Sequence, residues 1–357
     1  MTTLFDPLKI GNIELTNRMV MAPMTRSRAD DEGVQPRYVA DYYAQRSSTG
    51  LIITEATNVS LMAKGYVRTP GIFTDAQIES WQAVTKAVHD KGGRIFMQLF
   101  HTGRIALPDF LPGNAQPVAP SAVPAKGQNY TDKGMKPFVT PRELTREEIR
   151  AIVRDFATAS KNAISTGFDG VELHAASGYL VQQFLTTNAN LRADEYGGTI
   201  ENRTRFLFEV LDAMIAAVGN ERVGVKFSPR IKFNDVEEND ADVVYPYIMS
   251  RLNEQSLAYI HVMAFTKEGW HAKLRPLYKG VFFAGGGFTK ETGQALLESG
   301  GADAIVYGTP HVANPDLLER FRRNAPLNIP DQTTFYTPGE RGYTDYPVLE
   351  EATELNA

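Results

Sequence analysis

The sequence predicts an α/β fold, specifically a (β/α)8 or TIM barrel in a single domain over residues 1–357. Short apolar segments rich in β-branched residues alternate with helical segments along the chain. There are eight strand segments, the number that closes such a barrel. The first is followed by Pro23-Met24-Thr25 and lacks the Gly-x-Gly-x-x-Gly turn of an open dinucleotide-binding sheet, which argues against a Rossmann domain.

Each expected strand is a short apolar run of the kind that is buried in a parallel sheet. The expected strands are Met19–Ala22, Gly50–Glu55, Arg94–Phe100, Gly167–His174, Val223–Ser228, Tyr259–Met263, Val281–Gly285 and Ala304–Gly308. Start and stop signals mark the helices between them, such as the near capping box at Thr145 and the glycines after Lys91. The expected helices are Thr74–Lys91, Thr145–Thr166, Ile200–Val218, Asp242–Asn253, Thr289–Ser299 and Pro315–Arg323.

Two segments lie outside this alternation. Leu4–Thr16 has alternating apolar residues around Gly11-Asn12, which predicts an N-terminal hairpin that covers the floor of the barrel. Residues 105–143 are Pro-rich, polar and too long for a simple connection. We expect this insertion after the third strand to be an extended loop that caps the barrel mouth.

Composition excludes several classes of function. The net charge is −5, which gives no indication of a nucleic-acid surface. The chain has no Cys, which excludes disulfides, thiolate metal sites and a Cys nucleophile; its six His are scattered, so no metal site is expected. No apolar run is long enough for a membrane span and the N-terminus lacks a signal-peptide pattern, so the expected location is cytoplasmic.

The most informative segment is Val171–Tyr179, which places His174 at the end of the fourth strand and Tyr179 five residues later. Active sites of TIM barrels lie at this C-terminal end of the strands. An imidazole can hydrogen-bond a developing oxyanion and a phenol can deliver a proton. Polarisation combined with protonation is what the reduction of an activated C=C bond requires.

Glycines follow the last two strands, at Gly285–Gly287 and at Gly308. The loops after strands seven and eight are the usual phosphate site of a TIM barrel, where backbone N–H groups face the anion. These glycines therefore predict a phosphorylated substrate or cofactor.

A series of motifs, in order along the chain, resembles the Old Yellow Enzyme family of flavin-dependent ene-reductases. The resemblance covers roughly residues 4–348. The motifs include Ala22–Arg26, Gly65-Tyr66, Gln98, His101, Gly103-Arg104, His174–Ala176, Gly178–Leu180, Asp194–Gly198, Asn314–Leu317 and Tyr343–Pro347.

This resemblance implies that FMN lies across the barrel mouth and that NADPH serves as co-substrate for the reduction of enones, maleimides or nitroalkenes. His174 and Ser177 would hold the substrate oxygen, and Tyr179 would protonate the substrate. Tyr66, Phe100 and Tyr346 would line the substrate pocket, and the protein would be a monomer or a homodimer. The cofactor would contact Pro23, Met24, Thr25, Ala56, Gln98, Lys226, Gly286, Gly287, Gly308 and Thr309.

Several residues depart from the family pattern. Ser177 stands where the family usually has His or Asn, Lys226 and Thr309 stand where it usually has Arg, and Phe100 replaces a Trp. Arg230 could supply a missing charge if it pointed inward. Two alternatives therefore stay open: a repurposed relative with weak or no FMN that catalyses a non-redox isomerisation or cyclisation, and a catalytically silent barrel that serves as a binding protein.

Overall fold

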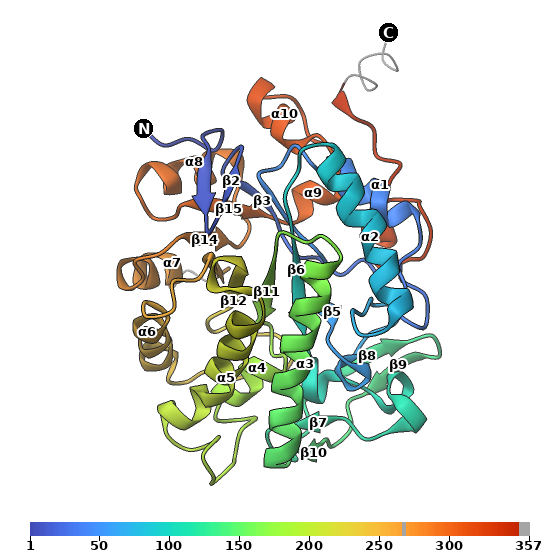
Figure 1. Ribbon diagram of the computed structural model, residues 1–357, viewed down its shortest axis with the longest axis vertical. Coiled ribbons are helices and arrows are strands. Elements are labelled where there is room, and N and C mark those ends of the chain that lie inside the picture. The colour runs from blue at the N-terminus through green and yellow to red at the C-terminus, as the bar shows by residue number, and fades with distance from the viewer. Residues whose placement is uncertain (266–268, 350–357) are drawn as a thin grey trace.

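The computed structural model describes residues 1–265 and 269–349. Within them, eight parallel strands pair edge to edge, and pairing of the β11 and β6 strands closes the ring into a barrel with helices outside it (Figure 1). Every barrel strand lies inside its predicted range, so the predicted TIM barrel is confirmed. The strands are β3 Met19–Met21, β4 Leu51–Ile53, β6 Ile95–Phe100, β11 Gly170–His174, β12 Val223–Phe227, β13 Tyr259–Met263, β14 Phe282–Gly285 and β15 Ala304–Tyr307.

Six helices correspond to the predicted ones: α2 Asp75–Asp90, α3 Arg146–Ser165, α5 Ile200–Val218, α6 Ala241–Leu252, α8 Lys290–Glu298 and α10 Leu317–Arg323, all within the described residues. Thr74, Thr145 and Thr289 each form a capping box that fixes a helix start. The sequence did not indicate four further helices, because segments of 5–7 residues are too short to show a helical period. These are α1 Tyr38–Ala44, α4 Leu180–Leu185, α7 Trp270–Leu274 and α9 Thr309–Ala313. No helix in the described ranges has the length and apolar character needed to cross a membrane.

The predicted N-terminal hairpin is confirmed as β1 Leu8–Ile10 paired antiparallel with β2 Ile13–Leu15. Ile10 and Leu15 are fully buried in one cluster with side chains of β3, β4, β6 and β14. Gly11 has a φ of +48°, and a Cβ there would lie 2.0 Å from the carbonyl oxygen of Glu221, in the turn Asn220–Arg222 that precedes β12. The hairpin therefore sits against the N-terminal end of the strands and closes that end of the barrel.

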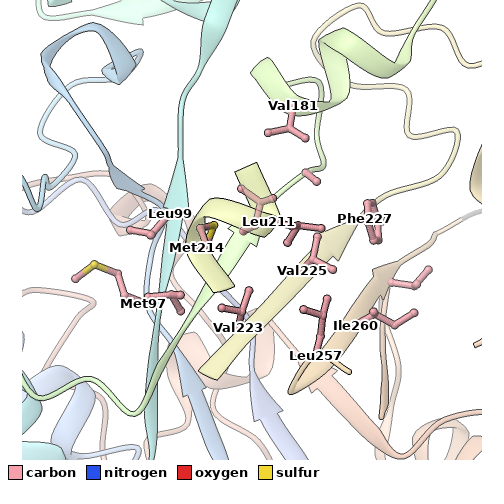
Figure 2. Packing of buried hydrophobic residues seen from close by; sticks show 14 of the residues in the cluster. Met97, Leu99, Val181, Leu211, Met214, Val223, Val225, Phe227, Leu257 and Ile260 are labelled. Atoms are coloured by element: carbon pink, nitrogen blue, oxygen red, sulfur yellow. The ribbon is translucent and has the colours of Figure 1, made fainter. Parts of the chain in front are cut away.

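Successive side chains along each barrel strand point alternately outward, to the layer beneath the helices, and inward, to the barrel interior. Val223, Val225 and Phe227 of β12 belong to the apolar layer beneath the helices, which Figure 2 shows together with Leu211 and Met214 of α5. The residues between them in sequence must then face the barrel interior. The same alternation in β11 turns Val171 and Leu173 outward and directs Glu172 and His174 inward.

The 105–143 insertion has more regular structure than a loop. Its C-terminal strand β10 Arg142–Glu143 pairs in parallel with β7 Val118–Ala119, and between these two strands lies a hairpin of β8 Gln128–Thr131 and β9 Gly134–Pro137. The short β5 Thr57–Asn58 pairs alongside β6. Asn129 of β8 fixes the hairpin, since its amide donates to the carbonyls of Gly65 at 2.7 Å and Ile105 at 3.1 Å.

Candidate active site

A cavity of about 550 Å³ lies at the C-terminal ends of the barrel strands. Eleven of the residues predicted to form the site line it, although they come from widely separated parts of the sequence. They are Pro23, Met24, Thr25, Ala56, Tyr66, Gln98, His174, Ser177, Tyr179, Lys226 and Thr309. A barrel brings them together because the loops that follow all eight parallel strands meet at one face.

His174 presents a neutral imidazole to this cavity. Its Nδ1 accepts a hydrogen bond from the backbone N–H of Ala176 at 3.3 Å, so the ring proton is on Nε2. Burial lowers the pKa of His174 well below its ordinary value, and the nearby Lys226 and His261 lower it further. At neutral pH the group is therefore an uncharged N–H donor.

The turn after β11 directs Tyr179 back into the cavity. Ser177 and Gly178 have φ values of +57° and +75°, which reverse the chain in two residues. The backbone N–H of Ser177 donates to Ser228 Oγ at 2.8 Å, and that of Gly178 donates to Gln182 Oε1 at 2.7 Å. These bonds hold a turn that would otherwise be strained.

Tyr179 and Tyr66 form a pair of phenols in the cavity wall. The Tyr179 hydroxyl donates to the Tyr66 hydroxyl at 3.0 Å, and the rings pack edge to face. The ring of Tyr179 also packs edge to face on His174, with ring centroids 4.9 Å apart. The predicted donor of a proton and the predicted holder of the substrate oxygen are thus direct neighbours.

Two predicted pocket residues lie elsewhere. Phe100 does not line the cavity; it is buried behind it, stacked on His174 with ring centroids 6.1 Å apart, where it supports the imidazole. Tyr346 is also absent from the wall, and its hydroxyl accepts a hydrogen bond from the backbone N–H of Asp331. The structure therefore does not bring these two side chains to the wall of the cavity.

Phe335 and Tyr336 supply the wall that had been assigned to Tyr346. No sequence motif singled these two residues out; they lie eight and seven residues before Tyr343. The insertion adds Asn129 and Tyr130, and the loop after β12 adds Phe233. Tyr130, Phe233 and Tyr336 are each at least half exposed, so the rim of the cavity is aromatic.

A buried polar network lies beneath the cavity. Glu172 accepts a hydrogen bond from Gln98 Nε2 at 2.7 Å and pairs with His261 Nδ1 at 3.1 Å. Lys226 is also buried, and no described residue forms a hydrogen bond or an ion pair with its ammonium group. Burial lowers the pKa of Lys226, whereas the charge of Glu172 raises it. A buried cation without a direct partner favours a bound group with negative charge or acceptor atoms.

Gly286, Gly287 and Gly308 lie outside the lining of this cavity. Gly286 and Gly287 have φ values of +130° and +86°, and a Cβ on Gly286 would lie 2.2 Å from the carbonyl oxygen of Ala264. Gly308 adjoins the site, since a Cβ there would be 3.6 Å from Met24 Sδ. Only glycine fits the turn at 286, and a turn after the seventh strand of a TIM barrel can direct backbone N–H groups at a phosphate. The glycine turns and Lys226 together fit a phosphorylated flavin such as FMN.

Arg230 does not replace the missing charge in the cavity. Its guanidinium donates to Asp242 at 2.6 Å and lies 5.9 Å from the ring of Trp270. Arg230 is not among the residues that line the cavity.

Comparison with known proteins decides the family. Residues 3–328 match the NADH:flavin oxidoreductase / NADH oxidase family. The chain is 45% identical over 355 residues to a probable flavin mononucleotide-dependent alkene reductase of Leishmania infantum, with 97% of each chain covered. It is 43% identical to 12-oxophytodienoate reductase 1 of Oryza sativa subsp. japonica, covering 98% of this chain and 94% of the relative.

The chain belongs to the Old Yellow Enzyme family. Solved structures of this family superpose on it closely. Morphinone reductase in complex with tetrahydroNAD gives a TM-score of 0.95 at 45% identity and covers 99% of both chains. The Old Yellow Enzyme homologue from Zymomonas mobilis gives a TM-score of 0.95 at 41% identity, covering 97% of this chain and 100% of the other. The protein is therefore an FMN-dependent oxidoreductase.

Proposed function

We propose that this Old Yellow Enzyme family member is an ene-reductase that uses NADPH to reduce activated C=C bonds in enones, maleimides and nitroalkenes. The observation that carries the proposal is the neighbouring pair of His174 and Tyr179 in one cavity with the buried Lys226. The names of the alkene reductase and 12-oxophytodienoate reductase relatives support it.

In this mechanism His174 orients the substrate. Its Nε2–H donates to the carbonyl or nitro oxygen, which polarises the conjugated C=C bond and stabilises the negative charge that develops on that oxygen. Ser177 lines the same wall and offers a hydroxyl as a shorter second donor. A neutral imidazole suits this role because it donates at physiological pH without competing for the proton that the product needs.

FMN, when bound and reduced, supplies the hydride for the β-carbon. Thr25, Ala56 and Gln98 line the part of the cavity where the flavin would be held, and Lys226 would face its polar edge. Tyr179 then delivers its hydroxyl proton to the α-carbon, which completes the addition of H⁻ and H⁺ across the double bond. The aromatic rim restricts the entry of water around the substrate.

The first experiment is a visible absorption spectrum of the purified protein after incubation with FMN and desalting. We expect retained flavin absorbance that NADPH bleaches and that an enone or N-ethylmaleimide restores under anaerobic conditions. A parallel titration with NADH tests the choice of nicotinamide.

Loss of flavin on desalting would contradict the proposal and would favour the non-redox isomerase or cyclase alternative. Flavin that is retained but not reduced by either nicotinamide would also contradict it.

A further inference from the structure

A residue outside the predicted set lies against the phenol pair. Asn234 is in the loop between β12 and α6, 55 residues after Tyr179. Its Nδ2 donates to the carbonyl oxygen of Ser177 at 2.8 Å. Its Cβ packs closely on Gly178: a Cβ added to that glycine would lie 2.6 Å from the Cβ of Asn234. Asn234 thus contacts both residues that precede Tyr179.

The Asn234 side chain borders Ser177 and Gly178, directly before Tyr179, and it is near enough to the hydroxyls of Tyr179 and Tyr66 to influence the pKa of both. Burial raises the pKa of Tyr179 well above its ordinary value, and the neighbouring Tyr66 raises it further; the Asn234 amide acts as a donor and lowers it. Burial likewise raises the pKa of Tyr66, whereas hydrogen bonds with Tyr179 and Asn234 lower it. One N–H of the amide is used on Ser177, which leaves the second for the phenols.

The backbone holds Asn234 in place. Asn234 and Asp235 both have left-handed φ values, +55° and +54°, and Asn and Asp tolerate this conformation best after Gly. The carbonyl of Asp235 accepts hydrogen bonds from Arg104 at 2.6 Å and from Asn188 at 2.7 Å. The amide is therefore fixed before substrate arrives.

From this geometry we propose that Asn234 is a positioning residue that, together with Tyr66, stabilises the Tyr179 phenolate that forms when the proton leaves for the substrate. The inference rests on the proposed ene-reductase function. In the step, the Tyr179 O–H bond breaks, a C–H bond forms at the α-carbon, and the negative charge moves from the substrate to the phenol oxygen. Tyr66, which accepts from Tyr179 beforehand, can then turn its own O–H toward the phenolate, and Asn234 supplies the second donor. Uptake of a proton from solvent restores the phenol.

The test uses the FMN-loaded protein and two variants that keep the left-handed backbone unstrained, Asn234→Asp and Asn234→Gly. Re-oxidation of the reduced flavin by cyclohexenone should slow by about ten- to a hundredfold, the usual effect of losing one donor to a developing charge. Flavin reduction by nicotinamide should not change, because it does not involve Tyr179. Re-oxidation by a nitroalkene should change least, because a nitronate can leave without protonation at carbon.

Asn188→Ala is the matched control, since it removes a hydrogen bond to the same loop but does not face the phenols. A second readout needs no catalysis: with tyrosine labelled at ¹³Cζ, the Tyr179 and Tyr66 resonances should shift in both Asn234 variants and stay in place in Asn188→Ala. Tyr179→Phe and Tyr66→Phe assign the resonances.

Unchanged ¹³Cζ shifts, or an enone rate within twofold of wild type, would overturn the role of Asn234. Equal losses with enone and nitroalkene, matched by Asn188→Ala, would overturn it too, because they would mean general loosening of the loop. Failure of the wild-type protein to reduce either substrate would instead overturn the proposed function, while the ¹³Cζ shifts would still decide whether Asn234 acts on the phenols.

Discussion

The imidazole of His174 lies beside Lys226 and His261, and both neighbours disfavour a positive charge on it. Its Nδ1 is occupied by the backbone N–H of Ala176, so one ring atom remains for a ligand. The position of a single backbone amide therefore decides which nitrogen carries the proton. This arrangement explains how a histidine can serve as a donor without serving as an acid.

Replacing His174 should weaken anionic and oxygen-containing ligands. We expect His174→Ala to raise the Kd of a para-substituted phenol by about tenfold or more, the effect of one lost hydrogen bond to a charged acceptor. His174→Asn keeps an N–H donor and should recover part of the affinity. Spectral titration of the FMN-loaded protein measures both. An unchanged Kd in His174→Ala would remove this residue from ligand binding.

Thr309 begins α9 next to the cavity, where the family usually has Arg. We expect Thr309→Arg to lower the Kd of FMN by about tenfold, since a guanidinium adds charge-assisted bonds to a phosphate. Thr309→Gln lengthens the side chain without charge and serves as the control. Fluorescence quenching of free FMN gives both constants. If the arginine brings no gain, backbone N–H groups or another cation already balance the phosphate, but not Arg230, which pairs with Asp242.

At the scale of elements, residues 334–342 form a strap that adds Phe335 and Tyr336 to the cavity wall and is held by two arginines. Arg26 donates to the carbonyls of Phe335 and Gly342. Arg28 donates to the carbonyls of Arg26, Thr334, Phe335, Gly339 and Arg341. These contacts join segments about 300 residues apart in sequence and hold Phe335 and Tyr336 in the cavity wall.

Loosening the strap should weaken the binding of the enone more than it slows the reduction of the bound enone. Arg28→Met removes the donor from the buried carbonyls of Arg26 and Thr334, each at a cost of about 1–3 kcal/mol. We expect a higher KM for enones, a smaller change in kcat, and faster proteolytic cleavage near residues 335–342. Arg28→Lys should be intermediate. Arg323→Met, on the exposed end of α10, is the control, and equal cleavage of both Met variants would contradict the role of the strap.

The regular elements of the fold could be predicted because their signals are local. Every barrel strand is an apolar run, and the long helices have capping residues such as Thr145. The short helices and the β8–β9 hairpin depend on tertiary contacts such as the Asn129 amide bonds, which no local pattern shows. Tyr346 was expected in the pocket from the family resemblance. The strap instead presents Tyr336, and that choice depends on arginines at the other end of the chain.

Over the whole molecule, burial holds most histidines neutral. The pKa of His101 and that of His311 are lowered by burial to about 3. Burial also lowers the pKa values of His174, His261 and His271. An unfolded chain would protonate all five near pH 6.5, which makes folding stability depend on pH.

The direction of this dependence follows from proton binding. Between pH 6.5 and about 3 the unfolded state binds more protons than the folded state at His101 and His311, so the free energy of unfolding falls as pH falls. Each contributes a slope of about 1.4 kcal/mol per pH unit. Urea unfolding between pH 7.5 and 5.0 should show it, before the carboxylates Glu148 and Asp194, with pKa values lowered to about 2, add their own loss.

His311→Gln should flatten this slope, because glutamine does not titrate and can still hydrogen-bond near Thr49 and Tyr307. His101→Gln should flatten it further when the two changes are combined. A midpoint of unfolding that stays constant from pH 7.5 to 5.0 in the wild type would contradict the assignment.

The hairpin of β1 and β2 closes the barrel at the N-terminal end of its strands, so that the cavity opens only at the other end. Among the described residues, Ile10 and Leu15 pack with apolar side chains of the barrel strands and fill the base. Every molecule that reaches the centre must leave through the opening by which it came. If the nicotinamide and the substrate bind at the same place in the cavity, one must therefore dissociate before the other can bind. An excess of one should then slow the binding of the other.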